Sequence, residues 1–183
     1  MTGNVDDTVT VWIATHRFAP LNPVFVGLGT IEKLGAVWIG LALLLGIGRR
    51  LGLWPTLTLA AFTGVVTLLA DTATFGIKDV VQRPRPFVTH PQIHPLYVVH
   101  SDSFPAGHAA TAFAGAVVLA WTARRWSALF VTLAVAVGFS RVYVGDHYVG
   151  DVLGGAFVGA LVAVVAVAVV TALARWRGSP PFV

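Results

Sequence analysis

The sequence predicts an all-α fold: a polytopic bundle of about five membrane-spanning helices that forms a single integral-membrane domain over residues 1–183. Composition is the first reason, because hydrophobic residues make up 56% of the chain and charged residues only 11%, against roughly 25% charged residues in an ordinary soluble domain. The second reason is that the apolar residues fall in separate runs, each close to the ~20 residues that a helix needs to cross a bilayer. No polar stretch of domain size lies between these runs, so we expect one compact bundle.

Five apolar runs are the predicted membrane spans. The first covers residues 34–48 with an apolar extension back to Leu21, and the others cover residues 55–77, 108–123, 126–143 and 149–174. The last run contains four closely spaced glycines, which are Gly150, Gly154, Gly155 and Gly159. Small residues at such spacings let a second helix approach closely, so we interpret these glycines as packing positions.

The opening segment differs from the spans because its apolar residues share one helical face. That face carries Val5, Val9, Trp12 and Ile13, and the acidic residues lie elsewhere. Such a pattern is typical of an amphipathic helix that lies in the membrane interface. If the first 30 residues crossed the membrane instead, the bundle would have six spans.

Pairs of basic residues between the spans predict the orientation of the bundle. These pairs are Arg49 with Arg50, Arg124 with Arg125, and Arg175 with Arg177. Under the positive-inside rule, all three pairs lie on the cytoplasmic side. The polar loop 79–107 and the turn 141–148 then lie on the extracytoplasmic face of the cell membrane, with either five or six spans. We therefore expect the polar stretches of the chain to meet on that outer face.

Charge and cysteine content narrow the kinds of partner. The chain has no cysteine, which excludes a disulfide framework and a thiolate metal site. Its net charge is only +4, and the cations lie at the ends of apolar runs, whereas a nucleic-acid-binding protein needs a clustered basic face. We therefore expect the lipid bilayer and its anionic lipids as partners, and no nucleic acid.

A histidine and an aspartate at the start of the last span form a candidate catalytic pair. His147 and Asp151 are four residues apart, which places them on one face of a helix and within reach of each other. A carboxylate beside an imidazole fixes its tautomer and stabilises the imidazolium, which makes the other ring nitrogen a competent base or nucleophile. The alternative is a pair that only satisfies its own hydrogen bonds at a helix end.

Three cations come from the polar stretches near this pair: Lys78, Arg85 and Arg141. A guanidinium binds phosphate in a bidentate fork and a lysine supplies a point charge, so this group predicts a site for an anion with several oxygens. Phosphoryl transfer depends on such charge stabilisation. For Arg83, a phosphate contact and an interfacial position near lipid headgroups are both open, and we interpret Lys33 as interfacial.

The segment 103–108 leads directly into the third predicted span. A helix N-terminus has free backbone N–H groups that bind anions, and Gly107 permits close approach of the backbone to a phosphate. His108 would lie at the rim of that site, where it can donate a proton to a leaving oxygen. A histidine at a helix start is otherwise a cap or an interfacial residue.

The order and spacing of these residues resemble a known family. Lys78 is followed after six residues by Arg85-Pro86, the second stretch reads Pro105-Ala106-Gly107-His108, and Ser140-Arg141 is followed by His147 and Asp151. These stretches resemble the three signature motifs of the type 2 phosphatidic acid phosphatase superfamily. The resemblance implies a metal-independent membrane lipid phosphatase that uses no cofactor.

The resemblance also implies a role for each residue. His147 would be the nucleophile that forms a phosphohistidine, Asp151 its partner, and His108 the general acid. The substrate phosphate would be held by Lys78, Arg85, Arg141, Ser140 and the Gly107 backbone. The substrate would be a lipid phosphate or diphosphate monoester, such as undecaprenyl or another polyprenyl diphosphate, phosphatidylglycerol phosphate or phosphatidic acid. A chain this short has little extra structure for recognising an elaborate headgroup, which favours an isoprenoid substrate.

One position departs from the family pattern. Where the second motif usually has serine, this chain has Ala106, so a hydroxyl near the phosphate is absent and only the backbone N–H remains. We expect a weaker phosphate grip, because a lost hydrogen bond to a charged group costs about 1.5–3 kcal/mol, and Ser103 is a candidate to compensate. Asp71, two helical turns before Lys78, is interpreted as structural support for that lysine or for an entry path.

Two other functions fit parts of the pattern. Vanadium-dependent haloperoxidases resemble these motifs and hold vanadate in the phosphate site, but they are soluble proteins, whereas apolar spans flank every motif here. A non-catalytic protein that binds or moves lipid phosphates would need the cations but no nucleophile or acid. The complete set of His108, His147 and Asp151 therefore favours an enzyme.

Overall fold

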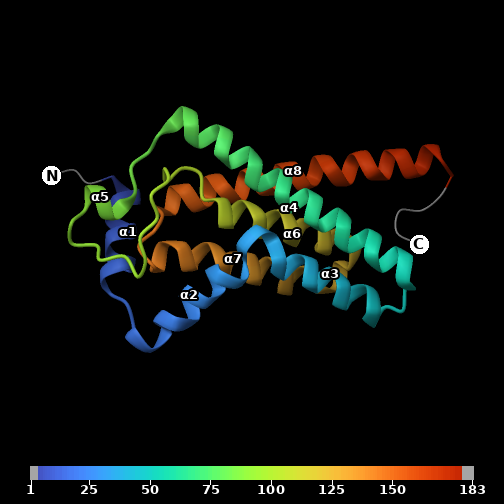
Figure 1. Cartoon of the computed structure of the whole chain (residues 1–183), viewed down its shortest axis with the longest axis horizontal. Helices are drawn as coiled ribbons and strands as arrows, with labels where there is room; N and C mark the ends of the chain where they lie inside the picture. Colours follow the sequence, from blue (N-terminus) through green and yellow to red (C-terminus); the bar gives the residue numbers. More distant parts are fainter. Residues whose placement is uncertain (1–3, 179–183) are drawn as a thin grey trace.

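The computed structural model describes residues 4–178, and all regular structure in that range is helical (Figure 1). The α-helices are α1 Val5–Thr15, α2 Asn22–Ile31, α3 Ala36–Gly48, α4 Leu53–Val81, α5 Pro86–Thr89, α6 Gly107–Thr122, α7 Ser127–Tyr143 and α8 Val149–Trp176. The short 3₁₀ helices are η1 Ala19–Leu21, η2 Lys33–Gly35 and η3 Arg124–Trp126. The predicted all-α class is confirmed.

Helix α6 forms the centre of the bundle and packs against α4, α7 and α8. Most of its buried residues are alanines, so the backbones of neighbouring helices approach it closely. On the side that faces α3, Gly115 leaves room for the fully buried Trp38, whose ring lies where a Cβ atom would be. The start of α6 is therefore held in place by helices on several sides.

The glycines of α8 pack against α6 and the segment before it, as predicted. A Cβ atom on Gly155 or Gly159 would meet the backbone carbonyl oxygen of Ala106 or Ala110, and one on Gly154 would meet the ring of Phe104. Gly150 is different, because its backbone N–H donates a 2.8 Å hydrogen bond to Asp6. Three of the four glycines are thus confirmed as packing positions.

The predicted spans all form as helices, although their lengths differ. Within residues 4–178, three segments are long and apolar enough to cross a membrane: Leu53–Thr89, Arg124–Tyr143 and Val149–Trp176. A fourth span results if α2 and α3 are counted together. Helix α6 is also apolar, but at 16 residues it is shorter than these. The expected continuous first span is wrong in detail, because η2 interrupts it and the two helices meet at a bend.

The two ends of the bundle differ in chemistry. The α3–α4 and α6–α7 connections meet at one end, where the Arg49 guanidinium donates a 2.7 Å hydrogen bond to the Thr122 carbonyl. Helices α1 and α5 and the long loop before α6 gather at the opposite end (Figure 1). The apolar side of α1 faces away from the protein, with Val5 76% and Trp12 61% exposed, whereas Thr10 is fully buried. The helix is therefore amphipathic, with its polar side against the bundle.

Candidate active site

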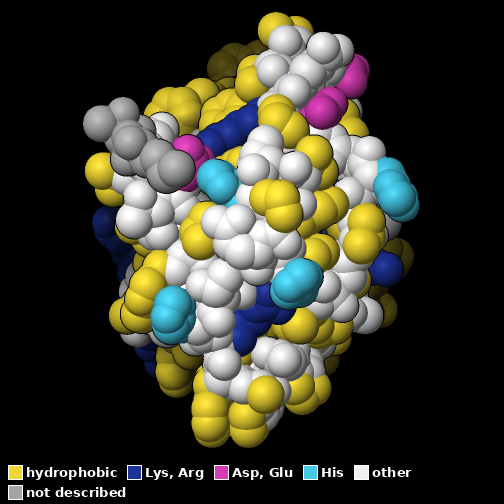
Figure 2. Space-filling model, turned by 90° about the vertical axis from the view of Figure 1, so that its left-hand side faces the viewer, with side chains coloured by type: hydrophobic (Ala, Val, Ile, Leu, Met, Phe, Trp, Pro, Cys, Tyr) yellow, Lys and Arg dark blue, Asp and Glu magenta, His cyan; other side chains and the backbone are white. Residues whose placement is uncertain are grey.

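The polar residues singled out in the sequence meet at the end of the bundle that carries α1 and α5. Figure 2 views this end, where Lys and Arg side chains and several histidines appear among apolar ones. The loop that connects α5 to α6 and the turn between α7 and α8 both lie here. The sequence expectation that these stretches meet on one face of the bundle is confirmed.

His147 lies in the turn between α7 and α8 and is 3% exposed. Its Nδ1 atom is 3.6 Å from Oδ2 of Asp151, and its Nε2 atom is 3.3 Å from Nη1 of Arg85. Burial is the main cause that lowers the pKa of His147 below its ordinary value, which favours the neutral imidazole. When Nδ1 carries the proton and faces Asp151, the lone pair of Nε2 points toward the cationic side of the site.

Asp151 is fully buried and accepts hydrogen bonds from three directions. The Tyr148 backbone N–H donates at 2.9 Å, Nη1 of Arg83 donates at 2.8 Å, and the Ser103 hydroxyl donates as well. The bond from Tyr148 also caps the first turn of α8, where a carboxylate is favoured by the free N–H groups and the helix dipole. One side chain thus begins the helix and orients His147.

Arg83 holds the Asp151 carboxylate through the contact given above. Its second guanidinium nitrogen, Nη2, donates a 2.9 Å hydrogen bond to Asp6 of α1. The guanidinium also lies 3.7 Å above the centroid of the Tyr148 ring. Arg83 therefore bridges two carboxylates and positions Asp151, a role that the sequence analysis had not considered.

Arg85 is 4% exposed and is bound on all sides. Its Nε donates to the Ser101 carbonyl at 2.6 Å, and Nη1 donates to the Asp146 carbonyl at 2.9 Å and to the Asp146 carboxylate. The other oxygen of that carboxylate accepts a 3.4 Å hydrogen bond from Tyr97 and lies 3.7 Å from Nε2 of His147. An internal anion therefore lies beside the candidate nucleophile, in contact with a candidate phosphate ligand.

Arg141 is fully buried at the end of α7. Its guanidinium donates to the Ser140 hydroxyl at 3.0 and 2.9 Å, to the Phe25 carbonyl at 3.0 Å, and to the Tyr97 hydroxyl. Burial and the nearby Asp146 raise the pKa of Tyr97 to about 12, so its hydroxyl stays protonated at neutral pH. In this structure the Ser140 hydroxyl orients Arg141, and the expected phosphate contact of Ser140 stays a prediction.

Lys78 and Ser103 fix the loop that precedes α6. The ammonium group of Lys78 donates to the Asp102 carbonyl at 2.5 Å and to the Ser103 carbonyl at 3.4 Å. The Ser103 hydroxyl lies 3.4 Å from Nδ1 of His147. These contacts place the expected lysine and the suggested compensating hydroxyl next to the His147–Asp151 pair.

The start of α6 differs in part from the expected anion cradle. The Ala106 backbone N–H donates a 2.9 Å hydrogen bond to the Asp151 carbonyl, so it is already used within the protein. Gly107 faces α4, where a Cβ atom would lie 2.9 Å from Oδ1 of Asp71. His108 is close enough to Arg141 and His147 to interact with them electrostatically. At the start of α6, His108 thus lies near Arg141, whereas the Ala106 N–H and Gly107 are engaged by other parts of the protein.

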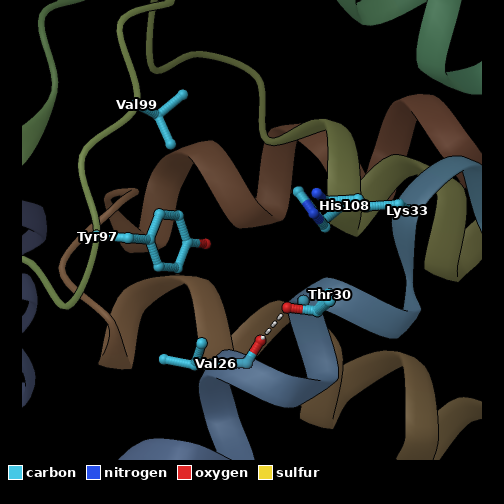
Figure 3. A pocket seen from close by; sticks show the side chains of 7 residues that line it. Val26, Thr30, Lys33, Tyr97, Val99 and His108 are labelled. Carbon is cyan, nitrogen blue, oxygen red and sulfur yellow. Dashed lines mark hydrogen bonds between the residues drawn. The ribbon is translucent and has the colours of Figure 1, made fainter.

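A cavity of about 410 Å³ opens between α2, the long loop and the start of α6. Figure 3 shows Tyr97 and His108 facing each other across it, with Thr30 and Val26 supplied by α2. Gly29 also lines this cavity, and a Cβ atom at that position would meet the guanidinium of Arg141. The cavity therefore borders the cationic group on one side and His108 on the other.

The sequence comparison decides the family. The model of the PAP2 superfamily matches residues 52–175, about two thirds of the chain. The chain belongs to the PAP2 superfamily. It is 33% identical over 160 residues to an undecaprenyl-diphosphatase of Sulfolobus acidocaldarius. That match covers 83% of this chain and 72% of that protein. It is 35% identical over 104 residues to the undecaprenyl-diphosphatase BcrC of Bacillus subtilis, but that match covers 56% of this chain and only about half, 52%, of that relative.

A solved PAP2 structure has the same helical arrangement. The crystal structure of a transmembrane PAP2 type phosphatidylglycerolphosphate phosphatase from Bacillus subtilis superposes with a TM-score of 0.64 at 27% sequence identity. The match covers 90% of this chain and 83% of that one. The likeness extends beyond the motifs to the bundle that positions them.

Several residues of this PAP2 site were missed in the sequence analysis. They are Asp146 and Tyr97, which connect Arg85 and Arg141, Asp6, which holds Arg83, and Glu32, which accepts hydrogen bonds from Trp38 and Thr111 at 2.8 and 2.9 Å. Asp146 had a usable signal, because it is a carboxylate that directly precedes His147 in a short turn. Tyr97 and Asp6 lie far along the chain from the residues that they contact, and no spacing rule connects them. Glu32 is close in sequence to Trp38 but distant from Thr111.

Proposed function

We propose that the protein hydrolyses a lipid phosphate or diphosphate monoester at the extracytoplasmic membrane face through a phosphohistidine intermediate. The observation that supports this most is the two-sided environment of His147, with a carboxylate at Nδ1 and a guanidinium at Nε2. This arrangement holds the imidazole in one tautomer and directs its free nitrogen toward an anion site. A protein that only binds lipid phosphates has no need for it.

In the first step, Nε2 of His147 attacks the phosphorus atom. The N–P bond forms as the bond from phosphorus to the leaving oxygen breaks, and His108 donates a proton to that oxygen. Arg85, Arg141 and Lys78 offset the charge on the other phosphate oxygens. Asp151 accepts the hydrogen bond from Nδ1 and stabilises the positive charge that develops on the ring.

In the second step, water attacks the phosphohistidine and His108 takes up one of its protons. The N–P bond breaks, inorganic phosphate leaves, and His108 is again protonated for the next cycle. No proton is gained or lost at His108 over the two steps. The cations and the two histidines supply the required chemistry, and we expect activity without added metal and in the presence of a chelator.

Substrate binding requires Asp146 to give up its contact with Arg85. The carboxylate lies within reach of both Arg85 and Nε2 of His147, which is the position that the phosphoryl group has to occupy. A phosphate brings more charge and more acceptor oxygens than a carboxylate does, so it competes well for the guanidinium. We propose that the incoming phosphate replaces Asp146 as the anion at this position.

The lipid tail is expected to remain in the bilayer. The cavity beside His108 has an apolar lining that includes Val26 and Val99, which suits the first carbons of an acyl or isoprenoid chain. Relatives of this chain are undecaprenyl-diphosphatases and a phosphatidylglycerophosphatase. We propose a substrate from these classes of lipid phosphate.

A substrate panel with a matched pair of histidine variants tests this function. Purified full-length protein is incubated with polyprenyl diphosphate, phosphatidylglycerol phosphate and phosphatidic acid, and released phosphate is measured. His147→Ala should lower turnover by at least about 1,000-fold, while His94→Ala, an exposed loop histidine, should leave it unchanged. Trapping of acid-labile phosphate on the wild type, absent from His147→Ala, supports the covalent step. Full activity in His147→Ala, or loss of activity with a chelator, contradicts the mechanism.

A further inference from the structure

We propose that Lys33 binds the proximal phosphate of a lipid diphosphate and so gives this enzyme a preference for diphosphates over monophosphates. The inference rests on the proposed function, since it takes His147 as nucleophile and His108 as acid. Lys33 belongs to η2, the break between α2 and α3 that packs against the start of α6. It is outside the sequence motifs and had been interpreted as an interfacial residue.

The first step of the argument is where the leaving group lies. If His108 protonates the leaving oxygen, the atoms attached to that oxygen must lie next to His108. His108 and Lys33 line the same cavity of about 410 Å³, and Figure 3 shows them side by side there. The terminal phosphoryl group would lie nearer Arg141, which borders this cavity at Gly29. Lys33 is therefore on the leaving-group side of the reacting bond.

The second step is that Lys33 is a cation with unused binding capacity. Lys78, Arg85 and Arg141 all donate to protein groups. Lys33 has an exposed side chain, and within residues 4–178 no hydrogen bond or ion pair engages its ammonium group. The ammonium group of Lys33 is therefore available to an anion in the adjoining cavity, where it can act as a point charge.

The third step concerns which ligand uses this cation. The first cavity is lined by the cation Lys33 and the imidazole of His108, with no carboxylate among its described lining residues. A second cavity of about 310 Å³ shares these two residues but also contains the carboxylates of Glu32 and Asp71. Those carboxylates repel an anion, so a phosphate is favoured in the first cavity. A diphosphate places its second phosphate there, whereas a monophosphate ester places only an uncharged carbon chain there.

The test compares two substrates that share one tail. Farnesyl diphosphate and farnesyl monophosphate are hydrolysed by the full-length protein in detergent micelles, with Lys33→Met, Lys33→Arg and the control Arg175→Met, which removes an exposed cation from α8. Lys33→Met should lower kcat/KM for the diphosphate about 10- to 100-fold and change that for the monophosphate less than about threefold. Lys33→Arg and Arg175→Met should stay within about threefold of the wild type on both substrates.

A second measurement covers the case in which Lys33→Met is poorly folded. Inorganic pyrophosphate and inorganic phosphate are compared as inhibitors of monophosphate hydrolysis by the wild type and by Lys33→Arg and Lys33→Gln. Weaker inhibition by pyrophosphate alone in Lys33→Gln supports the inference. Equal loss on both substrates, or an unchanged diphosphate rate, overturns it while leaving the proposed function intact. Absence of phosphate release by the wild type, or full activity in His147→Ala, instead overturns the proposed function and this inference with it.

Discussion

The carboxylate of Asp146 lies beside the candidate nucleophilic nitrogen. Its Oδ2 atom is 3.7 Å from Nε2 of His147. Burial lowers the pKa of His147, and the charge of Asp146 acts in the opposite direction. In the proposed mechanism the neutral imidazole is the reactive form. A lowered pKa therefore keeps His147 in that form at pH values below about 6.5, the ordinary pKa of histidine. Protonation of His147 is then expected to limit activity only at more acidic pH.

Removing that carboxylate should change the pH dependence in a defined direction. Asp146→Asn is expected to lower the pKa of His147 further and to move the acid limb of kcat/KM to lower pH, because an opposite charge no longer favours the imidazolium. The measurement is a pH–rate profile on one substrate, whose own ionisation is then the same for every variant. Asp7→Asn is the control, since Asp7 lies 3.7 Å from a different histidine, His90. A shift of the limb to higher pH in Asp146→Asn contradicts the arrangement.

Gly29 sets the position of Arg141 by having no side chain. A Cβ atom there would meet the guanidinium, which cannot move without losing hydrogen bonds to Phe25 and Tyr97. Gly29→Ala should therefore reduce kcat/KM about 10- to 100-fold. Gly27→Ala changes a glycine of the same helix with nothing within 4 Å, and it should remain as active as the wild type. Equal activity of the two variants would contradict the claim that Gly29 sets a position of Arg141 on which activity depends.

At the scale of residues, the motif positions were predictable and their partners were not. His147 and Asp151 are close in sequence, so helix geometry alone predicted their proximity. Ser140, in contrast, binds Arg141, and Arg83 binds Asp151 across 68 positions of the chain. Their types and spacings are equally compatible with a phosphate contact. The choice between a substrate contact and a positioning contact depends on the tertiary structure.

At the scale of helices, the contact between α6 and α8 determines how the site is assembled. The Ala106 N–H binds the Asp151 carbonyl at 2.9 Å, and Gly155 and Gly159 let the two backbones approach. The segment before α6 and the first turn of α8 are thereby joined directly. This contact fixes the separation between His108, the proposed general acid on α6, and His147, the proposed nucleophile beside α8.

Enlarging a glycine in this contact should cost stability. Gly159→Ala places a methyl group against the Ala110 carbonyl, and overpacking of this kind costs roughly 1–3 kcal/mol. A lower melting temperature in detergent is expected. Gly76→Ala in α4 has no atom within 4 Å of its new Cβ and should be unchanged or slightly stabilised, because alanine favours helix more than glycine does. Comparable melting temperatures for the two variants would contradict the close packing.

The break between α2 and α3 shows where sequence patterns stop being informative. Hydropathy is high on both sides, so the pattern predicted one span. The chain turns at Gly35, whose φ of +72° is unfavourable for other residues. The buried carboxylate of Glu32 accepts hydrogen bonds from Trp38 and from Thr111 of α6. Hydropathy alone did not reveal this interruption, because the partners of Glu32 are defined only by the packing of α3 and α6.

At the scale of the whole molecule, basic pairs and the candidate site lie at opposite ends of the bundle. The positive-inside rule assigns the first end to the cytoplasm and the site to the exterior. Because the chain has no cysteine, single-cysteine variants report sidedness without background. Gln92→Cys in the long loop should react with a membrane-impermeant maleimide on intact cells, whereas Arg177→Cys should react only after permeabilisation. The opposite pattern would place the site on the cytoplasmic side.

The contacts of helix α1 determine where a tag can be attached to this protein. Asp6 holds Arg83, and Arg83 holds Asp151, so a chain of two ion pairs joins the first helix to the partner of His147. A bulky tag fused just before residue 4 is expected to disturb these two ion pairs. The disturbance would reach His147 through Asp151, although the tag contacts no motif residue. Affinity tags, fluorescent fusions and surface tethers therefore belong after α8, at the end of the bundle away from the site.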